Sequence, residues 1–502
     1  MAAKKAVILA IDQGTTGTTV ALMDARGRVL TSVNHEFPQH YPKPGWVEHD
    51  PEDIWRSVLK GIRAVFRRGV AAATQVVAIG ITNQRETAML WDRASGAPLN
   101  RAIVWQCRRT TDFCEGLKQA GHEPLVKRKA GLVLDPYFSA SKYRWLLKNT
   151  PGASALLRQG KVAAGTVDSF LLWRLTGGAV HGTDVSNASR TSLLNIRTLR
   201  WDRELAALFD VPVSILPAVL PSSGELGHTS GVPGLPDGIP ISGIAGDQQS
   251  ALFGQACFKA GDAKCTFGTG SFILMNTGDQ RLTSKAGLLT TVAWQLGDAG
   301  KPQYALEGGA FVCGAAVQWL RDQLGIIKRA ADVETLAASV SDHEGVEFVP
   351  ALTGLGAPHW DPAARGLLCG LTRGSGRGHI ARATLDAMAL QNVDILLSME
   401  RDLGKRMRGL RVDGGAAANN LLMQLQANYL GRKLVRPRVI ETTVAGACFL
   451  AGLGVGLWQS TRELGSVWQA EREFSVSLSA KKRLQRHSDW QLAVKRARLS
   501  ED

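Results

Sequence analysis

The sequence has few cysteines and lacks the spacings that mark a metal-binding or disulfide-bonded protein. Its seven cysteines are Cys107, Cys114, Cys257, Cys265, Cys313, Cys369 and Cys448. They form no CxxC pair and no Cys/His zinc spacing, and their number is odd in a chain of 502 residues. Such cysteines are typical of reduced, mostly buried thiols. We therefore expect a cytoplasmic protein.

Long hydrophobic runs are also absent. Only six apolar residues precede Asp12, which is too few for a secretory signal, and they predict a first strand. Residues 442–461 carry no charge over a membrane-spanning length. Their apolar part, 444–458, is shorter than a span and contains four glycines. We expect a buried core helix there and no membrane insertion.

The common nucleotide-binding and metalloprotease motifs are missing as well. There is no GxxxxGK[ST], no kinase-type Gly-rich loop and no HExxH, which excludes a P-loop protein. The net charge is +15, but the basic residues are scattered apart from 127–129 and 481–498. The second stretch favours a solvated amphipathic helix, and a moderate positive field suits anionic substrates. Without a clustered basic face carrying aromatics, we expect no nucleic-acid partner.

The patterns that are present favour an α/β protein of two or three domains. Strands alternate with helices through most of the 502 residues, and 45% hydrophobic content is typical of a globular chain. Residues 54–66 place Ile54, Val58, Ile62 and Phe66 on one helical face. Residues 76–82 and 102–105 predict buried strands, and a helix is expected from near Val167 to residue 175.

Two Gly-Thr hairpins stand out. Residues 8–24 predict a strand, a tight turn and a second strand, in which Gly14 and Gly17 permit the sharp bend. The turn can cradle a phosphate, and Asp12 can hold a cation through water, although a plain β-hairpin gives the same pattern. A similar hairpin at 263–278 favours phosphate binding. Together the hairpins imply a duplicated architecture whose turns face each other across a cleft.

Other segments place polar groups where strands end. Arg85 and Glu86 follow the strand at 76–82 and suit a triol, or else a surface ion pair. Asp247 follows an apolar run at the start of a helix, where it is either a general base or a helix N-cap. Tyr137 offers a phenol to a hydroxyl or packs on the core. A third Gly cluster at 413–415 lets the backbone approach a flat ligand, and Asn419 can bond a base edge.

The three Gly motifs resemble those of the actin-like ATPase fold, and the segments between them resemble the FGGY carbohydrate kinase family. These segments are YPKPGWVEHDP (41–51), GITNQRET (80–87), VWQCRRT (104–110), GLVLDPYFS (131–139), SGIAGDQQSALFGQ (242–255) and LTGLGAPHWDP (352–362). The resemblance implies two actin-like (ribonuclease H-like) domains flanking a deep cleft. Residues 1–255 would form an N-terminal, glycerol-binding domain and 262–455 a C-terminal, nucleotide-binding domain. Residues 456–502 would form a basic, helical extension.

The resemblance further implies ATP-dependent, Mg²⁺-assisted phosphorylation of glycerol to sn-glycerol 3-phosphate. Asp247 would act as the general base, and glycerol would contact Arg85, Glu86, Tyr137, Asp247 and Gln248. Trp105 and Phe272 would cover its carbon skeleton, unless they are plain core. Asp12 and Asp247 would hold Mg²⁺. The nucleotide side would comprise Thr15, Thr16, Gly17, Thr19, Thr269, Gly314, Gln318, Gly415 and Asn419. For Gly314, close helix packing is the other interpretation.

The chain departs from the family pattern at two places. Family members usually carry Ser and then Arg where this chain has Gly17 and Thr19, so one cation near the nucleotide phosphates is missing. The loop at 231–240 lacks the Arg with which many bacterial relatives bind fructose 1,6-bisphosphate. We therefore expect weak or absent inhibition by that sugar phosphate.

Two alternative functions remain open at this stage. A kinase for another small polyol or sugar of the same family would share most of these segments. A non-enzymatic actin-like nucleotide switch would keep both hairpins but would not need NQRET, DPYFS and GDQQ together. A homo-oligomer, dimer or tetramer, is expected from the resemblance.

Overall fold

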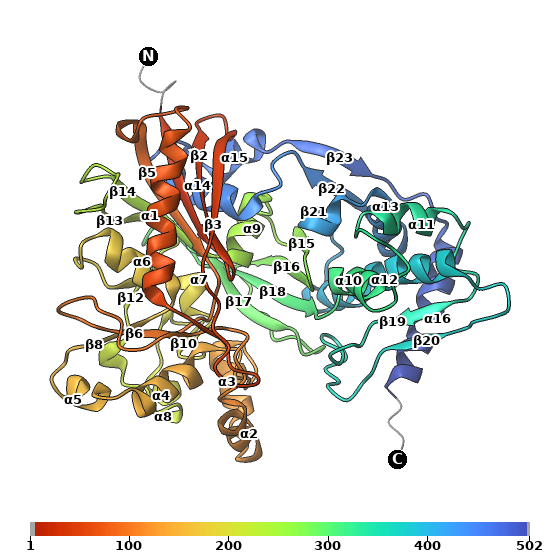
Figure 1. Ribbon diagram of the computed structural model, residues 1–502, viewed down its shortest axis with the longest axis horizontal. Coiled ribbons are helices and arrows are strands. Elements are labelled where there is room, and N and C mark those ends of the chain that lie inside the picture. The colour runs from red at the N-terminus through yellow and green to blue at the C-terminus, as the bar shows by residue number, and fades with distance from the viewer. Residues whose placement is uncertain (1–5, 499–502) are drawn as a thin grey trace.

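The computed structural model describes residues 6–498, whose strands form two large sheets (Figure 1). The N-terminal sheet has the order β13 (Ser223–His228), β14 (Pro240–Gly246), β5 (Val76–Asn83), β1 (Val7–Gln13), β2 (Gly17–Asp24) and β3 (Val29–Glu36). The C-terminal sheet has the order β17 (Leu289–Trp294), β18 (Gln303–Ala310), β16 (Ser271–Gly278), β15 (Ala263–Phe267), β21 (Gly409–Asp413), β22 (Lys433–Pro437) and β23 (Ala470–Phe474). Both predicted hairpins, β1–β2 and β15–β16, are present.

The two sheets repeat one strand arrangement, as the paired hairpins predicted. In each, the hairpin is followed by an antiparallel third strand, β3 or β18. On the other side of the hairpin lies a parallel strand, β5 or β21, and then a second one, β14 or β22. An antiparallel strand, β13 or β23, ends this side of each sheet. The predicted fold class, two actin-like α/β halves, is confirmed.

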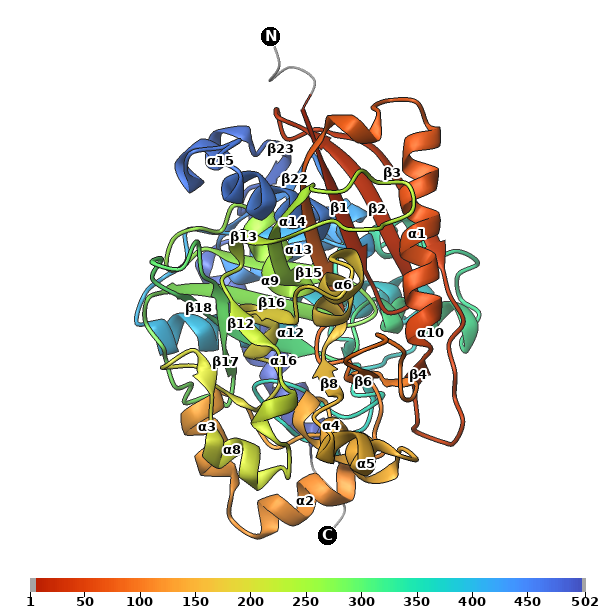
Figure 2. The same ribbon diagram turned by 90° about the vertical axis from the view of Figure 1, so that its left-hand side faces the viewer.

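Helices cover both sheets. Helix α1 (Pro51–Arg67) lies along β2 and β3 and buries Ile54, Val58 and Ile62 as predicted (Figure 2). Its N-terminus is capped by the Asp50 side chain, which accepts from the Glu52 N–H. Helix α14 (Thr442–Gly454) is the core helix predicted from the uncharged stretch, and it packs on β1, β5, β14 and α9 (Asp247–Gly254) of the N-terminal half.

Close backbone contacts hold α14 on the N-terminal sheet. A Cβ added to Gly80 of β5 would lie 2.2 Å from the Ala447 carbonyl oxygen, and one added to Gly446 would lie 1.9 Å from the Ser250 carbonyl oxygen. Ala, Cys and Phe side chains of α14 fill the cluster between them with Ile8, Ala10 and Ala78. Small residues therefore allow this helix to lie directly on the strands.

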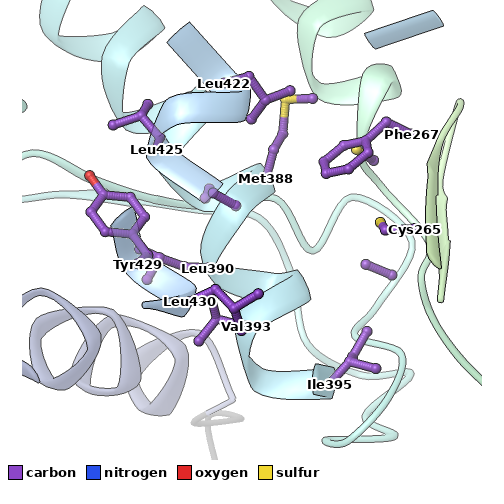
Figure 3. Close-up of a cluster of buried hydrophobic side chains, with 14 of the residues drawn as sticks. Cys265, Phe267, Met388, Leu390, Val393, Ile395, Leu422, Leu425, Tyr429 and Leu430 are labelled. Carbon is purple, nitrogen blue, oxygen red and sulfur yellow. The ribbon is translucent and has the colours of Figure 1, made fainter. Parts of the chain in front are cut away.

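The C-terminal half has its own hydrophobic core (Figure 3). Helices α12 (Arg377–Leu403) and α13 (Asn420–Leu430) line it with many side chains, and β15 contributes Cys265 and Phe267. The labelled residues also include Met388, Leu390, Val393, Ile395, Leu422, Leu425, Tyr429 and Leu430. Helix α16 (Ala480–Ala497) adds Trp490, Ala493 and Val494 to this core. The basic segment predicted as a solvated helix is therefore packed along one side.

Two sequence-based expectations need correction. Residues 102–105 form only a two-residue strand, β7 (Ala102–Ile103), paired with β4 (Glu48–His49), because the flanking residues turn away into loops. The segment after residue 455 is not wholly helical, since β23 lies between α15 (Thr461–Val467) and α16 and pairs with β22. The predicted N-terminal domain begins at residue 1 and the predicted extension ends at residue 502, but residues 1–5 and 499–502 lie outside the part of the chain that the structure describes. Among residues 6–498, no helix has the length and apolar character needed to cross a membrane.

The remaining elements complete the two halves. The helices are α2 (Thr111–Gln119), α3 (Glu123–Ala130), α4 (Ser139–Asn149), α5 (Ala153–Arg158), α6 (Val167–Leu175), α7 (Val185–Ala188), α8 (Arg203–Leu208), α10 (Gly314–Asp322), α11 (Asp332–Ala338), η2 (Ala73–Gln75), η3 (Val213–Ile215) and η4 (Gly415–Ala418). The short strands are β6 (Met89–Asp92), β8 (Val162–Gly165), β9 (Gly182–Asp184), β10 (Leu194–Asn195), β11 (Arg200–Trp201), β12 (Ala218–Leu220), β19 (Glu347–Val349) and β20 (Leu367–Cys369).

Candidate active site

The first Gly-Thr turn connects β1 to β2 and is held by side chains. The Gly14 N–H donates to the Gly17 carbonyl at 2.9 Å, which closes the turn. Thr15 Oγ1 accepts from Trp105 Nε1 at 2.9 Å, and Thr16 is exposed. Thr19 lies further along β2, where its hydroxyl accepts from Asn34 Nδ2 at 3.0 Å. Thr15 is thus joined to Trp105, whereas Thr19 is engaged by the neighbouring strand.

Asp12 lies at the end of β1 beside this turn. Its Oδ2 accepts from the Thr443 hydroxyl of α14 at 2.6 Å. Burial raises the pKa of Asp12 to about 6, against the lowering effect of the Thr443 hydrogen bond, and the negative charge of Asp247 raises it further. The two carboxylates predicted to share a cation are therefore close enough to repel each other.

Arg85 and Glu86 follow β5 and are fully buried. The alternative interpretation of these two residues, a surface ion pair, is therefore wrong. Arg85 donates to Glu307 of β18 through both terminal nitrogens, at 2.6 and 3.0 Å. Glu86 has a φ of 61°, and its carboxylate accepts from Arg190 Nε at 2.7 Å. Its carbonyl accepts from Lys142 Nζ at 3.1 Å, which fixes this strained backbone position.

Asp247 is the first residue of α9, and Gly246 occupies the N-cap position. The Asp247 Oδ1 lies 3.1 Å from Arg85 Nε, and its side chain is 31% exposed. Burial raises the pKa of Asp247, while Arg85 opposes that rise. The carboxylate thus contacts the Arg85 guanidinium and remains partly accessible, as a general base requires.

Gln248 contacts the C-terminal half through a buried lysine. Its Oε1 accepts from Lys264 Nζ of β15, and the same ammonium donates to Thr266 Oγ1 at 2.8 Å. Lys264 has no exposed surface, and burial lowers its pKa. A cation from the second hairpin therefore contacts Gln248, one of the predicted acceptor-binding residues, and the charge of Asp247 acts on the pKa of this lysine.

The aromatic residues lie in two places. Trp105 and Tyr137 meet edge to face, with ring centroids 5.7 Å apart and planes at 80°. Tyr137 is half-buried, and burial raises its pKa well above the ordinary value. Phe272 lies on β16 opposite Gly309, two residues from Glu307 on β18. Trp105 and Tyr137 therefore pack against each other, whereas Phe272 lies on the strand pair that carries Glu307.

The second Gly-Thr turn is held by backbone. The Thr269 carbonyl accepts from Cys313 N at 2.8 Å and from Ala315 N at 3.0 Å. A Cβ added to Gly314 would lie 2.7 Å from the Gly268 carbonyl oxygen. Close packing of α10 on the turn, the other interpretation of Gly314, is thus present. Thr269 is exposed on this turn, and Gln318 is exposed one helical turn into α10.

The third Gly cluster joins β21 to α13. Gly415 is exposed with open space where a side chain would be. Asn419 is the N-cap of α13, and its Oδ1 accepts from the Leu422 N–H at 2.8 Å. That oxygen is therefore engaged within the chain. Asp413 is buried and accepts from Gln255 Nε2 at 2.8 Å and from the Thr442 hydroxyl at 2.6 Å.

The sequence analysis missed three charged residues of this region: Arg190, Lys264 and Glu307. Arg190 stands alone among Ser, Asn and Thr in the stretch 186–192, and Lys264 and Glu307 are single charges within apolar strands. For Lys264 and Glu307 the available signal was a lone charge within an apolar stretch, because such a group needs a partner when it is buried. A separate pocket of about 570 Å³ between α12 and α16 contains none of the predicted site residues.

Family comparisons match both halves of the chain. The model described as the FGGY family of carbohydrate kinases, N-terminal domain, matches residues 7–254, and the model for the C-terminal domain of that family matches 263–455. The chain belongs to the FGGY family of carbohydrate kinases, as the motif resemblance implied.

Two relatives that are similar over nearly the whole chain are named glycerol kinase. The chain is 59% identical over 489 residues to the glycerol kinase of Bdellovibrio bacteriovorus, covering 97% of this chain and 99% of that one. It is 53% identical over 494 residues to the glycerol kinase of Symbiobacterium thermophilum, covering 98% and 99%. A crystal structure of Plasmodium falciparum glycerol kinase with ADP superimposes with a TM-score of 0.94 at 36% identity, covering 99% of both chains.

Proposed function

We propose that this chain transfers the γ-phosphoryl group of ATP to glycerol, giving sn-glycerol 3-phosphate and ADP. The observation that carries the proposal is the cluster of Arg85, Glu86, Asp247 and Gln248, in which Arg85 contacts both carboxylates and Gln248 contacts Lys264 of the second hairpin. The cluster offers carboxylate acceptors, an amide and the guanidinium N–H groups of Arg85 that do not bind Glu307, and a small triol can pair its hydroxyls with these groups. High identity to relatives named glycerol kinase supports the same acceptor.

In the proposed reaction, Asp247 accepts the proton of the attacking hydroxyl. The hydroxyl oxygen forms a bond to the γ-phosphorus while the bond from that phosphorus to the β–γ bridging oxygen breaks, and ADP leaves with that oxygen. The position of Asp247 at the start of α9, beside Arg85, supports this role. General-base catalysis supplies about 10²- to 10⁴-fold, so alignment of the acceptor and phosphate must supply the rest.

The nucleotide phosphates would be bound by the two turns. Thr15, Thr16 and Gly17 would act from the first turn and Thr269 from the second, with Thr19 further along β2. The adenosine side would be lined by Gly314, Gln318, Gly415 and Asn419. Exposure of Thr16, Thr269 and Gly415 supports this assignment, whereas Asn419 has only its amide nitrogen left for a base edge.

Mg²⁺ would be held near Asp12 and Asp247. The raised pKa of Asp12, caused by burial and then by the Asp247 charge, fits a position where a cation relieves repulsion between two carboxylates. Within residues 6–498 no group of three or more His, Cys, Asp or Glu could hold a metal. This fits an ion that keeps water and phosphate oxygens as most of its ligands. Bound with ATP, Mg²⁺ neutralises charge on the phosphoryl oxygens.

The proposal is tested by ADP release with glycerol, dihydroxyacetone, xylulose, gluconate or no acceptor. We expect glycerol to give the highest kcat/KM and the reaction to require Mg²⁺. A higher kcat/KM for another acceptor would establish the alternative sugar or polyol kinase. ADP release independent of any acceptor would favour the nucleotide switch. Light scattering tests the expected dimer or tetramer, and the cytoplasmic location is measured by fractionation of the source cells.

A further inference from the structure

A buried ion network joins the two sheets beside the candidate acceptor site. Glu307, on β18 of the C-terminal sheet, binds Arg85 of the N-terminal half through two hydrogen bonds of 2.6 and 3.0 Å. Its Oε1 also accepts from Arg190 Nη2 at 2.9 Å. Arg190 Nε in turn donates to Glu86 Oε1 at 2.7 Å. One carboxylate of the C-terminal half thus holds two arginines of the N-terminal half.

The network is desolvated and electrically balanced. Its four side chains are between 0 and 5% exposed, and two guanidinium groups face two carboxylates. Burial raises the pKa of Glu307, but Arg190 and Arg85 lower it more strongly, to about 2. Removal of one member would therefore leave an uncompensated buried charge.

Glu307 fixes the orientation of Arg85. A planar guanidinium binds a carboxylate best through two parallel N–H groups, and Glu307 takes both terminal nitrogens of Arg85. The Nε of Arg85 is left 3.1 Å from Asp247 Oδ1 and 3.8 Å from Glu86 Oε1. Arg85 Nη1 also donates to Gln249 Oε1 at 3.2 Å. Without Glu307, this longer bond would remain, and the terminal nitrogens would be free to turn toward the Asp247 and Glu86 carboxylates, which are needed for the acceptor.

Arg190 performs a similar role for Glu86. It has no exposed surface, and its guanidinium lies 5.3 Å from the centre of the Phe138 ring. Its Nε–H holds the Glu86 carboxylate at 2.7 Å, in a pair whose side chains are both buried. Because Arg190 is fully enclosed, it acts on a bound molecule only through Glu86 and Glu307.

We infer that Glu307 and Arg190 are positioning residues for the acceptor alcohol, acting through Arg85 and Glu86. The polar part of the acceptor site, although built on the N-terminal half, is then complete only while β18 of the C-terminal half contacts it. This inference rests on the proposed function and adds two residues to it. Neither residue touches the acceptor.

The first test uses Glu307→Asp, which keeps the charge but is one methylene too short to hold both arginines. We expect kcat/KM for glycerol to fall about 10²-fold, since a misplacement near 1 Å has that effect. The loss should come mainly from a raised glycerol KM, with the KM for ATP unchanged. A purely structural lesion would not separate the two substrates in this way.

Glu347→Asp is the matched control. Glu347 on β19 also binds an arginine, Arg486, through both carboxylate oxygens, and the two side chains are 9 and 8% exposed. This variant should lower the melting temperature while leaving the glycerol KM unchanged. An equal rise in glycerol KM in both variants would overturn the inference.

A double-mutant cycle gives the second test. Glu307→Gln and Arg190→Met each leave an unbalanced buried charge, whereas the double variant is neutral again. We expect the double variant to lose less glycerol kcat/KM than the product of the single losses, and multiplicative losses would contradict coupling. If the wild type shows no glycerol-dependent ADP release, the proposed function fails. If the wild type is active and Glu307→Asp retains its glycerol KM, only this inference fails.

Discussion

The two Gly-Thr turns have the same strand arrangement around them but are held in different ways. Side chains support the first turn. Gln84 Nε2 donates to the Gly14 carbonyl at 3.1 Å and lies 3.3 Å from His49 Nδ1, and Trp105 bonds Thr15. Backbone supports the second turn, where the N–H groups at the start of α10 donate to the carbonyls of Gly268 and Thr269.

The two turns of the duplicated fold are therefore connected to different parts of the molecule. Side-chain support connects the first turn to Trp105 and therefore to the acceptor side, so its geometry follows that of the acceptor residues. Backbone support leaves the Thr269 side chain exposed and needs only small residues around it. We expect substitutions around the first turn to act through altered polar side-chain interactions and those around the second to act through steric clashes with the backbone.

The largest effect is expected from Asp247→Asn, which removes charge on the acceptor side without changing shape. Turnover should fall by about 10²- to 10⁴-fold while glycerol affinity stays roughly intact, because the amide cannot accept the proton. Steady-state kinetics and glycerol binding measure the two effects. Asp210→Asn, at an exposed ion pair with Arg144 and Lys148, is the control. Undiminished turnover would remove Asp247 from its role.

The support of the first turn should be sensitive to acid. Burial lowers the pKa of His49 to about 4, and His40 adds to that effect. Its Nε2 bonds Gln39 Oε1 at 2.6 Å and its Nδ1 faces Gln84. The unfolded chain therefore binds a proton more readily than the folded one between pH 6.5 and 4. Stability falls as pH falls through this window, by about 3 kcal/mol in total.

The variant His49→Gln isolates this contribution. Denaturant unfolding between pH 7 and pH 4 should show a smaller acid-dependent loss in the variant than in the wild type. Parallel pH curves for the two proteins would show that His49 makes no such contribution.

A smaller effect is expected from a pair of glycine substitutions that compares the turns directly. In Gly314→Ala the new Cβ would meet the Gly268 carbonyl at 2.7 Å, a rigid backbone contact. In Gly17→Ala it would meet Asn34 Oδ1 at 3.0 Å, where the side chain can move, and the His35 carbonyl oxygen at 3.1 Å, a longer contact than the one at Gly314. We expect the KM for ATP to rise about tenfold in the first variant and less in the second. The reverse order would contradict the distinction between backbone and side-chain support.

The smallest effect is expected at the loop 231–240 of the N-terminal half. Here the Gly231 N–H donates to Asp237 Oδ1 at 2.7 Å, and the loop has no basic residue. Millimolar fructose 1,6-bisphosphate should therefore not inhibit ADP release. Strong inhibition would refute the expectation, and loss of that inhibition in Arg63→Ala, next to Gly234, would locate the anion on α1.

The sequence predicted those parts of the fold that depend on local pattern. Residue spacing and composition within short segments predicted both hairpins and the core helix α14. They also predicted helix α1 and its buried face of Ile54, Val58 and Ile62. The strand at 102–105 was overestimated because an apolar run does not reveal where its hydrogen-bonding partner ends.

The site could be predicted only where residues cluster in the sequence. Arg85 with Glu86 and Asp247 with Gln248 are neighbours, and their motifs are visible. Glu307 binds Arg85 across 222 positions, and Arg190 binds Glu86 across 104. Such pairs come together only through the fold, so no local pattern reports them. The capping bond of Asn419 was missed because base recognition and helix capping use the same amide oxygen.

The position of α14 has a consequence for synthesis of the chain. Ile8 and Ala78 of the N-terminal sheet are covered by residues that the ribosome adds more than 400 and 350 positions later, respectively, on α14. Until residue 454 has been synthesised, α14 does not cover this apolar face of the N-terminal sheet. A nascent or truncated chain would expose that face to chaperones and to other nascent chains, so the N-terminal half reaches its native state only after α14 has been synthesised.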